Sequence, residues 1–197
     1  MPHKRFYFDL ETTGTNPYKH GFFQMATIIE VDNQVVEEQT YFCKPEGTPD
    51  PETMKFHGFE MNEFDKEKYL SIGLFYSALK SKLSRHIDKY NRTDKFHVVG
   101  YNIHSFDIPF LRRCFDNRGD KYFGSWFWHP SIDVMLIWAE ALQNERHKIK
   151  DFKNATVARY LGIEVDEGRL HEALYDITIT KQLYQLYLQQ HRQQGVK

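Results

Sequence analysis

The amino-acid sequence predicts an α/β fold built on a mixed β-sheet. Three runs with strand character lie near the N-terminus, and segments of helical and strand character alternate after them. This order is typical of α/β domains. The chain has 197 residues, of which 41% are hydrophobic, which is enough to bury one sizeable core. We therefore expect a single domain over residues 1–197.

The three N-terminal runs cover residues 5–9, 22–31 and 34–43. Asp32 and Asn33 separate the second run from the third, and both residue types favour tight turns. The pattern predicts a hairpin beside a first strand. A loop rich in proline and glycine follows and leads into a short helical stretch at residues 52–57.

The rest of the chain predicts four helices and one buried strand. Apolar residues recur at helical spacing from residue 74 to 90. We interpret the other side of this helix as a solvated face that carries Lys80, Lys82, Arg85 and Lys89. The buried strand is expected at residues 96–101, and the other helices at residues 108–115, 156–161 and 174–190. The apolar segment 132–138 is ambiguous between strand and helix.

Charge and cysteine content limit the classes of partner and compartment. The 26 Lys and Arg residues nearly cancel the 27 Asp and Glu residues, so the overall field does not attract nucleic acid or an anionic membrane, and a polyanion would have to be bound locally. The two cysteines are too few for a disulfide framework, which favours a reducing compartment and a cytoplasmic location. No apolar run is long enough to span a membrane.

An Asp-x-Glu pair ends the first predicted strand. Asp9 and Glu11 lie two residues apart, so the two-residue period of a strand places both carboxylates on one face. Two like charges held together favour the binding of a hard cation such as Mg²⁺ or Mn²⁺. Taken alone, the pair is also compatible with a solvated strand end.

Two further clusters contain candidate site residues. Asp107 follows the buried strand, at the place where α/β sheets commonly bind ligands, although it could also cap the next helix. His171 and Asp176 would lie about 140° apart on one uninterrupted helix and could not share a site. If His171 instead lies in the loop before the helix, it can turn back toward Asp176. A lone histidine in such a loop is otherwise a surface residue.

Together, the three clusters resemble the sequence motifs of the DEDDh 3′→5′ exonucleases, a family that includes polymerase proofreading subunits, ribonuclease T, oligoribonuclease and bacterial exonuclease I. The motifs occur in the family's order over nearly the whole chain. They supply all of the family's catalytic positions, as Asp9, Glu11, Asp107, His171 and Asp176. Residues 41–45, residues 57–58 and the segment around Asp133 look most like the nuclease domain of bacterial exonuclease I.

The resemblance implies a ribonuclease H-like fold, in which helices flank a mixed five-stranded sheet. It implies hydrolysis of single-stranded nucleic acid from the 3′ end to 5′-mononucleotides, with DNA favoured over RNA. Asp9 would bridge two Mg²⁺ or Mn²⁺ ions, Glu11 and Asp176 would complete one metal site, and Asp107 would support the other. His171 would be the general base, because histidine changes its charge near neutral pH.

The resemblance also implies contacts with the substrate. The terminal nucleotide would meet backbone groups of Thr12 and Thr13 and a pocket lined by Asn102 and His104. Beyond the motifs, Arg112 and Arg113 follow Asp107 closely and are candidates for phosphate contact. The Trp-Phe-Trp run at residues 126–128 could stack on bases, but we favour core packing for it.

Two alternatives remain open at this level. One keeps the chemistry but takes short RNA as substrate, as oligoribonuclease does. The other is a catalytically silent nucleic-acid-binding or polymerase-docking module on the same fold. The presence of every catalytic residue type argues against the silent module, because clustered acids without a metal would destabilise the fold. A polymerase partner, the oligomeric state and the biological role are not predicted by the sequence.

Overall fold

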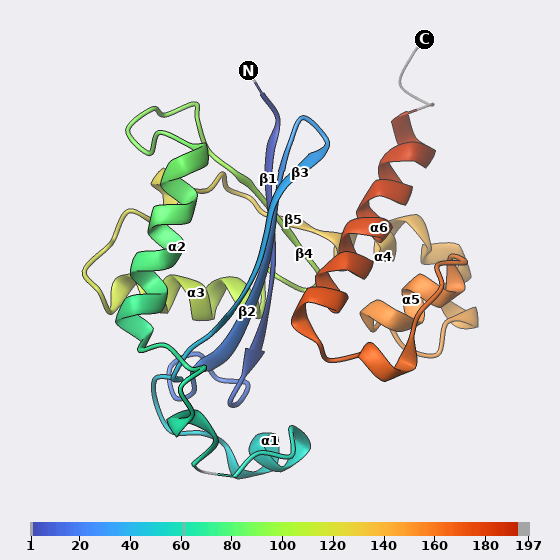
Figure 1. Ribbon diagram of the computed structural model, residues 1–197. Coiled ribbons are helices and arrows are strands. Elements are labelled where there is room, and N and C mark those ends of the chain that lie inside the picture. The colour runs from blue at the N-terminus through green and yellow to red at the C-terminus, as the bar shows by residue number, and fades with distance from the viewer. Residues whose placement is uncertain (1, 61, 193–197) are drawn as a thin grey trace.

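The computed structural model describes residues 2–60 and 62–192, and a five-stranded sheet lies at its centre (Figure 1). The predicted domain limits, residues 1 and 197, lie outside the described residues. The strands are β1 (Lys4–Thr12), β2 (Phe22–Val31), β3 (Gln34–Phe42), β4 (His97–Gly100) and β5 (Ile132–Asp133). Their order in the sheet is β3–β2–β1–β4–β5, so β1 is the central strand.

The sheet is mixed, as the sequence predicts. The pairs β1–β2 and β2–β3 are antiparallel, whereas β1–β4 and β4–β5 are parallel. The predicted hairpin joins β2 to β3, and its turn residues Asp32 and Asn33 have φ angles of 49° and 67°. Two successive positive φ angles match the twist of the flanking strands, which explains the Asp-Asn pair at this turn.

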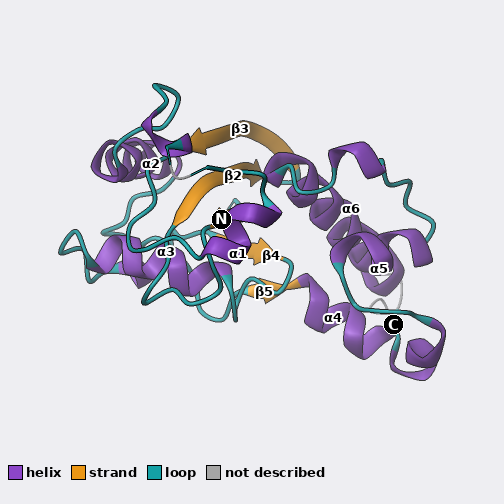
Figure 2. Cartoon of the chain, turned by 90° about the horizontal axis from the view of Figure 1, so that it is seen from below, coloured by secondary structure: helices purple, strands orange, loops and turns teal. Residues whose placement is uncertain are grey.

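Helices cover both faces of the sheet. Figure 1 shows α2 and α3 on one face and α4, α5 and α6 on the other, and Figure 2 shows the same layers from below. The helices are α1 (Pro51–Phe56), α2 (Ile72–His86), α3 (Asp107–Asp116), α4 (Val134–Ala141), α5 (Asn154–Tyr160) and α6 (Ala173–Arg192). Short 3₁₀ turns occur at Glu63–Asp65, Phe123–Ser125, Gln143–Lys148 and Glu167–Arg169. Within the described residues, no helix combines the length and apolar character needed to cross a bilayer.

Most predicted elements are present, with small shifts of their ends. The helix predicted at residues 74–90 ends at His86. The ambiguous segment 132–138 divides into both alternatives, because β5 covers Ile132–Asp133 and α4 starts at the next residue. Asp133 causes this change, since its side chain accepts a hydrogen bond from the backbone N–H of Met135 and caps α4.

The alternation of side chains along β1 separates the two cores. Phe6, Phe8 and Leu10 pack in the core under α2 and α3, whereas Tyr7 packs in the core under α4, α5 and α6. Asp9 and Glu11 have the same parity as Tyr7 and therefore lie on the α6 face. The prediction that both carboxylates share one face is confirmed.

The interpretation of the helix at residues 74–90 as having a solvated basic face is wrong at Lys82. This side chain is buried, and its Nζ donates to Thr27 Oγ1 at 3.1 Å and lies 3.5 Å from Glu37 Oε1. Burial lowers the pKa of Lys82. The solvated-face interpretation considered only the helix, but α2 packs against the sheet closely enough for β2 and β3 to enclose this ammonium group.

The Trp-Phe-Trp run is mainly core, as we favoured. Trp126 and Phe127 are buried in the core under α2 and α3. Trp128 is half-buried, and its ring stacks on that of His97 with the centroids 6.2 Å apart. Base stacking is therefore not the role of the first two residues.

Candidate active site

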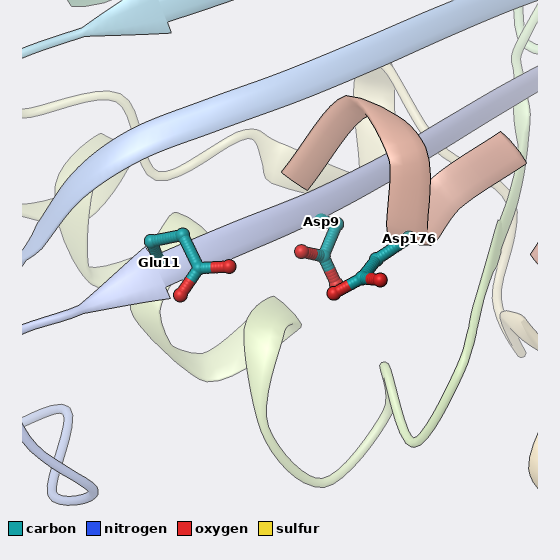
Figure 3. Close-up of side chains that lie close together, drawn as sticks. All are labelled: Asp9, Glu11 and Asp176. Carbon is teal, nitrogen blue, oxygen red and sulfur yellow. The ribbon is translucent and has the colours of Figure 1, made fainter. Parts of the chain in front are cut away.

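Three carboxylates meet where β1 passes the beginning of α6. Asp9 and Glu11 come from the second half of β1, and Asp176 comes from the first turn of α6. One carboxylate oxygen of each lies within 4.8 Å of the others. Figure 3 shows the three side chains gathered between the strand and the helix. The residues come from distant parts of the sequence, so the fold brings together the first and third clusters.

Asp107 joins the same region from α3. It is the first residue of that helix and is buried, and its Oδ1 accepts a hydrogen bond from the backbone N–H of Leu10 at 3.0 Å. Leu10 lies between Asp9 and Glu11, so this bond ties the second cluster directly to the first. The structure therefore brings all four acids to one segment of β1.

Burial and mutual repulsion act on these acids. Burial raises the pKa of Glu11 to about 8, with a further contribution from Asp176. Burial also raises the pKa of Asp107 to about 8. The pKa of Asp9 is raised well above its usual value by burial and by Asp107, Glu11 and Asp176. Burial raises the pKa of Asp176 as well, although His171 opposes the shift. The four acids therefore resist full ionisation near neutral pH unless a cation is bound.

The donor set fits a hard divalent cation. Every candidate ligand atom in the cluster is a carboxylate oxygen, and the three groups already lie close enough to share an ion. No histidine or cysteine is part of the cluster formed by the described residues. Mg²⁺ and Mn²⁺ prefer such oxygen ligands. The residues present therefore suit the predicted cations.

His171 lies in the turn before α6, as its alternative placement required. Its φ angle is 69°, and α6 begins two residues later at Ala173. The imidazole ring packs edge-on against Phe56, with the ring centroids 5.4 Å apart. The left-handed backbone at this residue interrupts the helical path, so His171 is not held on the side of the helix away from Asp176.

Tyr175 is directed into the preceding loop. Its hydroxyl oxygen accepts a hydrogen bond from the backbone N–H of Asp166 at 2.6 Å, and the Arg169 guanidinium lies 4.6 Å from its ring centroid. The tyrosine is therefore engaged in holding the loop that carries His171.

His57, which was not among the predicted site residues, lies beside them. Its Nε2 is 4.0 Å from Glu11 Oε2, and its ring packs edge-on against Phe23. A hollow of about 450 Å³ opens here, with Glu11, Phe56, His57 and His171 in its lining. The segment around α1 thus forms a wall of the site. The sequence contains the pair His57-Gly58, but no local pattern relates it to Glu11, which lies 46 residues earlier.

Thr12 and Thr13 continue the chain from β1 and are both buried. The backbone N–H of Thr13 donates to the Gly21 carbonyl at 2.8 Å, and its own carbonyl accepts from the backbone N–H of Asp50 at 2.7 Å. Its hydroxyl also pairs with the backbone of Gly21. For the Thr13 backbone to contact a nucleotide, it would have to give up its hydrogen bond with Gly21 or with Asp50.

Asn102 and His104 lie in the loop between β4 and α3, and Asp133 organises this loop. The carboxylate of Asp133 accepts hydrogen bonds from the backbone N–H groups of Asn102 at 2.9 Å and His104 at 3.3 Å. Asn102 has a φ angle of 54°, which asparagine tolerates better than most residues. At Gly100 an added Cβ would approach the Ile103 side chain to 2.2 Å, so glycine permits the tight start of the loop.

Comparison with known proteins supports one family. The family model for exonucleases, RNase_T, matches residues 6–184. The DNA polymerase III PolC-type protein of Mycoplasma pneumoniae is 27% identical over 190 residues, which are 96% of this chain and 12% of that protein. The corresponding protein of Mycoplasma genitalium is 25% identical with the same coverage. The chain therefore spans a small part of these curated relatives.

Solved structures agree on the fold. Escherichia coli exonuclease I in complex with a dT13 oligonucleotide matches with a TM-score of 0.71 and 24% identity, over 97% of this chain and 42% of that one. Its complex with a dA16 oligonucleotide matches with a TM-score of 0.76 and 21% identity, with the same coverage. The predicted ribonuclease H-like fold is confirmed. Because the matched region runs from β1 into α6 and includes the whole acidic cluster, the chain belongs to the DEDDh family of 3′→5′ exonucleases.

Proposed function

We propose that this chain removes nucleotides one at a time from the 3′ end of a single-stranded nucleic acid and releases 5′-mononucleotides, with DNA favoured over RNA. The observation that carries the proposal is the convergence of Asp9, Glu11 and Asp176 at one end of β1. The matched exonuclease I structures hold DNA oligonucleotides, which supports a DNA substrate. The PolC-type relatives are named as DNA polymerases, which supports a polymerase context for the activity. The low cysteine content supports a cytoplasmic location.

The proposed mechanism assigns a role to each acidic residue. Asp9 would contribute to the binding of both of two Mg²⁺ or Mn²⁺ ions, together with Glu11 and Asp176 at one site and with Asp107 at the other. When bound, the ions lower the pKa of a water molecule and offset charge on the phosphate. The hydrogen bond from Leu10 keeps Asp107 in a fixed place, so this carboxylate needs little rearrangement to hold a cation.

His171 acts as the general base in this proposal. An imidazole nitrogen takes a proton from the attacking water as its oxygen forms a bond to the scissile phosphorus. The bond between phosphorus and the 3′-oxygen of the preceding nucleotide then breaks, and solvent supplies a proton to that oxygen. Phe56 limits the directions in which the His171 ring can turn, which favours a ring position suited to proton transfer.

The four substrate-binding residues complete the proposal. Thr12 and Thr13 would meet the terminal nucleotide through their backbone groups, which for Thr13 requires exchange of its hydrogen bonds with Gly21 or Asp50. Asn102 and His104 would contact the nucleotide from the loop that Asp133 holds. A purely structural module on this fold would carry the buried acids at a cost in stability, since burial raises the pKa of each of them. This cost favours catalysis over the silent alternative.

The activity is tested by digesting 5′-labelled DNA and RNA of matched sequence, each single- and double-stranded, and following the product ladder. We expect stepwise shortening of single-stranded DNA with Mg²⁺ or Mn²⁺, and slower shortening of RNA. Activity should vanish in EDTA and return with added metal, because the acids need a divalent cation. Undiminished digestion after thorough chelation would contradict the metal-dependent mechanism, and faster digestion of RNA would reverse the substrate preference.

Asp9→Asn should stabilise the metal-free protein, and more so as pH rises. The folded-state pKa values of the acids lie above their unfolded values of about 4. The folded state therefore holds more protons between pH values of about 4 and 8, and its stability falls as pH rises through this range. Replacing the Asp9 carboxylate by an amide should therefore reduce the fall in folding stability between these pH values. Thermal unfolding in EDTA at pH values near 5 and near 8 measures the difference.

The exposed residue Asp116 provides a matched control, because Asp116→Asn makes the same change in charge away from the cluster. We expect the melting temperature of this control to stay close to that of the parent protein at both pH values, whereas the gain of Asp9→Asn over the parent grows with pH. If Asp9→Asn melted below the parent protein in EDTA at the higher pH, Asp9 would be a structural residue.

His171→Ala should reduce the rate by roughly 10²–10⁴-fold while metal binding is retained, because the imidazole is not a proposed ligand. Tyr175→Phe should lose little, since its hydroxyl bonds to the loop at Asp166. High pH should partly restore the rate of His171→Ala, because hydroxide needs no base. Single-turnover rates on single-stranded DNA measure both variants. An active His171→Ala variant together with an inactive Tyr175→Phe variant would reverse the assignment of the base.

A further inference from the structure

A second hollow, of about 180 Å³, lies between α3 and the segment that leads to β5. We call it the α3 hollow. The residues of its lining that matter here are His104, Arg112, Phe123, Phe127, His129 and Ser131. The hollow is distinct from the one between Glu11 and His171, and the two have no lining residue in common.

The charge of the α3 hollow is unusual for this chain, whose net charge is −1. Three side chains that can carry positive charge line it, and none of its lining residues is Asp or Glu. Four other hollows in the described part of the chain each include an acid in their lining, namely Glu46, Asp94, Asp116 and Glu11. The lining of the α3 hollow therefore offers an anion more positive than negative groups. The nearest carboxylate described above, that of Asp133, lies behind the lining and is already bound to the backbone N–H groups of Asn102 and His104.

Arg112 is available to such an anion. It is exposed, and it takes part in none of the ion pairs found among residues 2–60 and 62–192. Its guanidinium carbon lies 5.2 Å from the ring centroid of Phe123, so the side chain extends over the aromatic part of the lining. Arg113, the other sequence candidate for phosphate contact, donates instead to the carbonyl of Pro17. Arg112 can therefore donate to a ligand in the hollow, whereas Arg113 donates to the protein backbone.

The remaining donors are held close together. His104 Nδ1 lies 3.4 Å from Ser131 Oγ, and the rings of His104 and His129 are 6.2 Å apart. Asp133 also fixes the backbone of His104. Imidazole, hydroxyl and guanidinium groups all donate hydrogen bonds, and a phosphate offers several acceptor oxygens. The buried rings of Phe123 and Phe127 make one side of the hollow apolar, and an apolar surrounding strengthens hydrogen bonds between these donors and a phosphate.

The position of the hollow relates it to the catalytic acids. His104 lies in the loop that runs directly into Asp107, and Arg112 is five residues after Asp107 on α3. Five residues of helix place Arg112 about 7.5 Å along the axis and about 140° around it from Asp107. Ile108, the residue after Asp107, also lines the hollow, so the hollow begins beside the catalytic acid. A strand whose end reaches Asp107 would pass around the start of α3 to reach Arg112.

We infer that the α3 hollow binds a phosphodiester group of the nucleic-acid strand, at a nucleotide away from the scissile bond, through Arg112, His129 and Ser131. His104, which the proposed function assigns to the terminal nucleotide, positions the Ser131 hydroxyl. This inference rests on the proposed function for the identity of the strand. The same chemistry would also accept the phosphate of a free mononucleotide. Binding at this hollow holds the strand while successive nucleotides are removed, and it supplies the local attraction that the nearly neutral chain otherwise lacks.

The test measures binding of a fluorescently labelled single-stranded DNA oligomer by anisotropy in EDTA, so that no cleavage occurs. Arg112→Gln and His129→Gln should weaken binding, with a roughly tenfold increase in Kd for Arg112→Gln, as expected for loss of a charge-assisted contact. The slope of log Kd against log salt concentration should fall by about 0.7 for Arg112→Gln. Arg92→Gln makes the same change at another exposed arginine and should leave both quantities unchanged.

A second experiment tests whether the bound phosphate belongs to the strand or to a free mononucleotide. Calorimetric titration with a 5′-mononucleotide should show no difference between the parent protein and Arg112→Gln. A loss of mononucleotide binding with unchanged DNA binding would overturn the assignment to the strand. Equal Kd values and salt slopes for Arg112→Gln and Arg92→Gln would overturn the site altogether.

Melting temperatures serve as the folding control, since Arg112 is exposed and its loss should not change them. The binding assay needs no catalysis. If the parent protein were inactive, the proposed function would be contradicted, but the assay would still measure whether Arg112 contributes to DNA binding.

Discussion

The structure depends on one electrostatic constraint, the crowding of four acids around the second half of β1. Asp9, Glu11 and Asp176 come within 4.8 Å of one another, and Asp107 is buried beside them. Burial raises the pKa of each acid, so the cluster opposes folding at neutral pH when no cation is present. A divalent cation converts this repulsion into attraction. The same arrangement that costs stability therefore suits the cluster to a divalent cation.

The surrounding elements hold the acids in place against this repulsion. The Leu10 backbone fixes Asp107 to β1, and the Asn154 side chain donates to the Asp176 carbonyl at 3.0 Å, which ties α6 to α5. Asp133 holds the loop before α3. Each contact joins segments that are far apart in the sequence. The catalytic geometry is thus a product of the whole layered fold.

The sequence predicted the features that depend on local patterns. Alternation along β1 placed Asp9 and Glu11 on one face, and the order of the motifs predicted the family. Contacts between distant segments were beyond such reasoning. Lys82 occupies a helix position that local periodicity assigns to solvent, but neighbouring strands enclose it. His57 reaches Glu11 only because the α1 segment folds back over the end of β1. Arg112 and the donors His129 and Ser131 likewise come together around the α3 hollow only because α3 packs beside the segment that leads to β5.

We propose that the acidic cluster is a site for two divalent cations. Titration of the parent protein with Mn²⁺, followed by electron paramagnetic resonance of the free ion, measures the stoichiometry directly. We expect binding of about two ions per chain in the parent protein in the presence of a 5′-mononucleotide, and loss of this binding in Asp9→Asn. Equal binding by the parent protein and Asp9→Asn, or no specific binding by either, would contradict it.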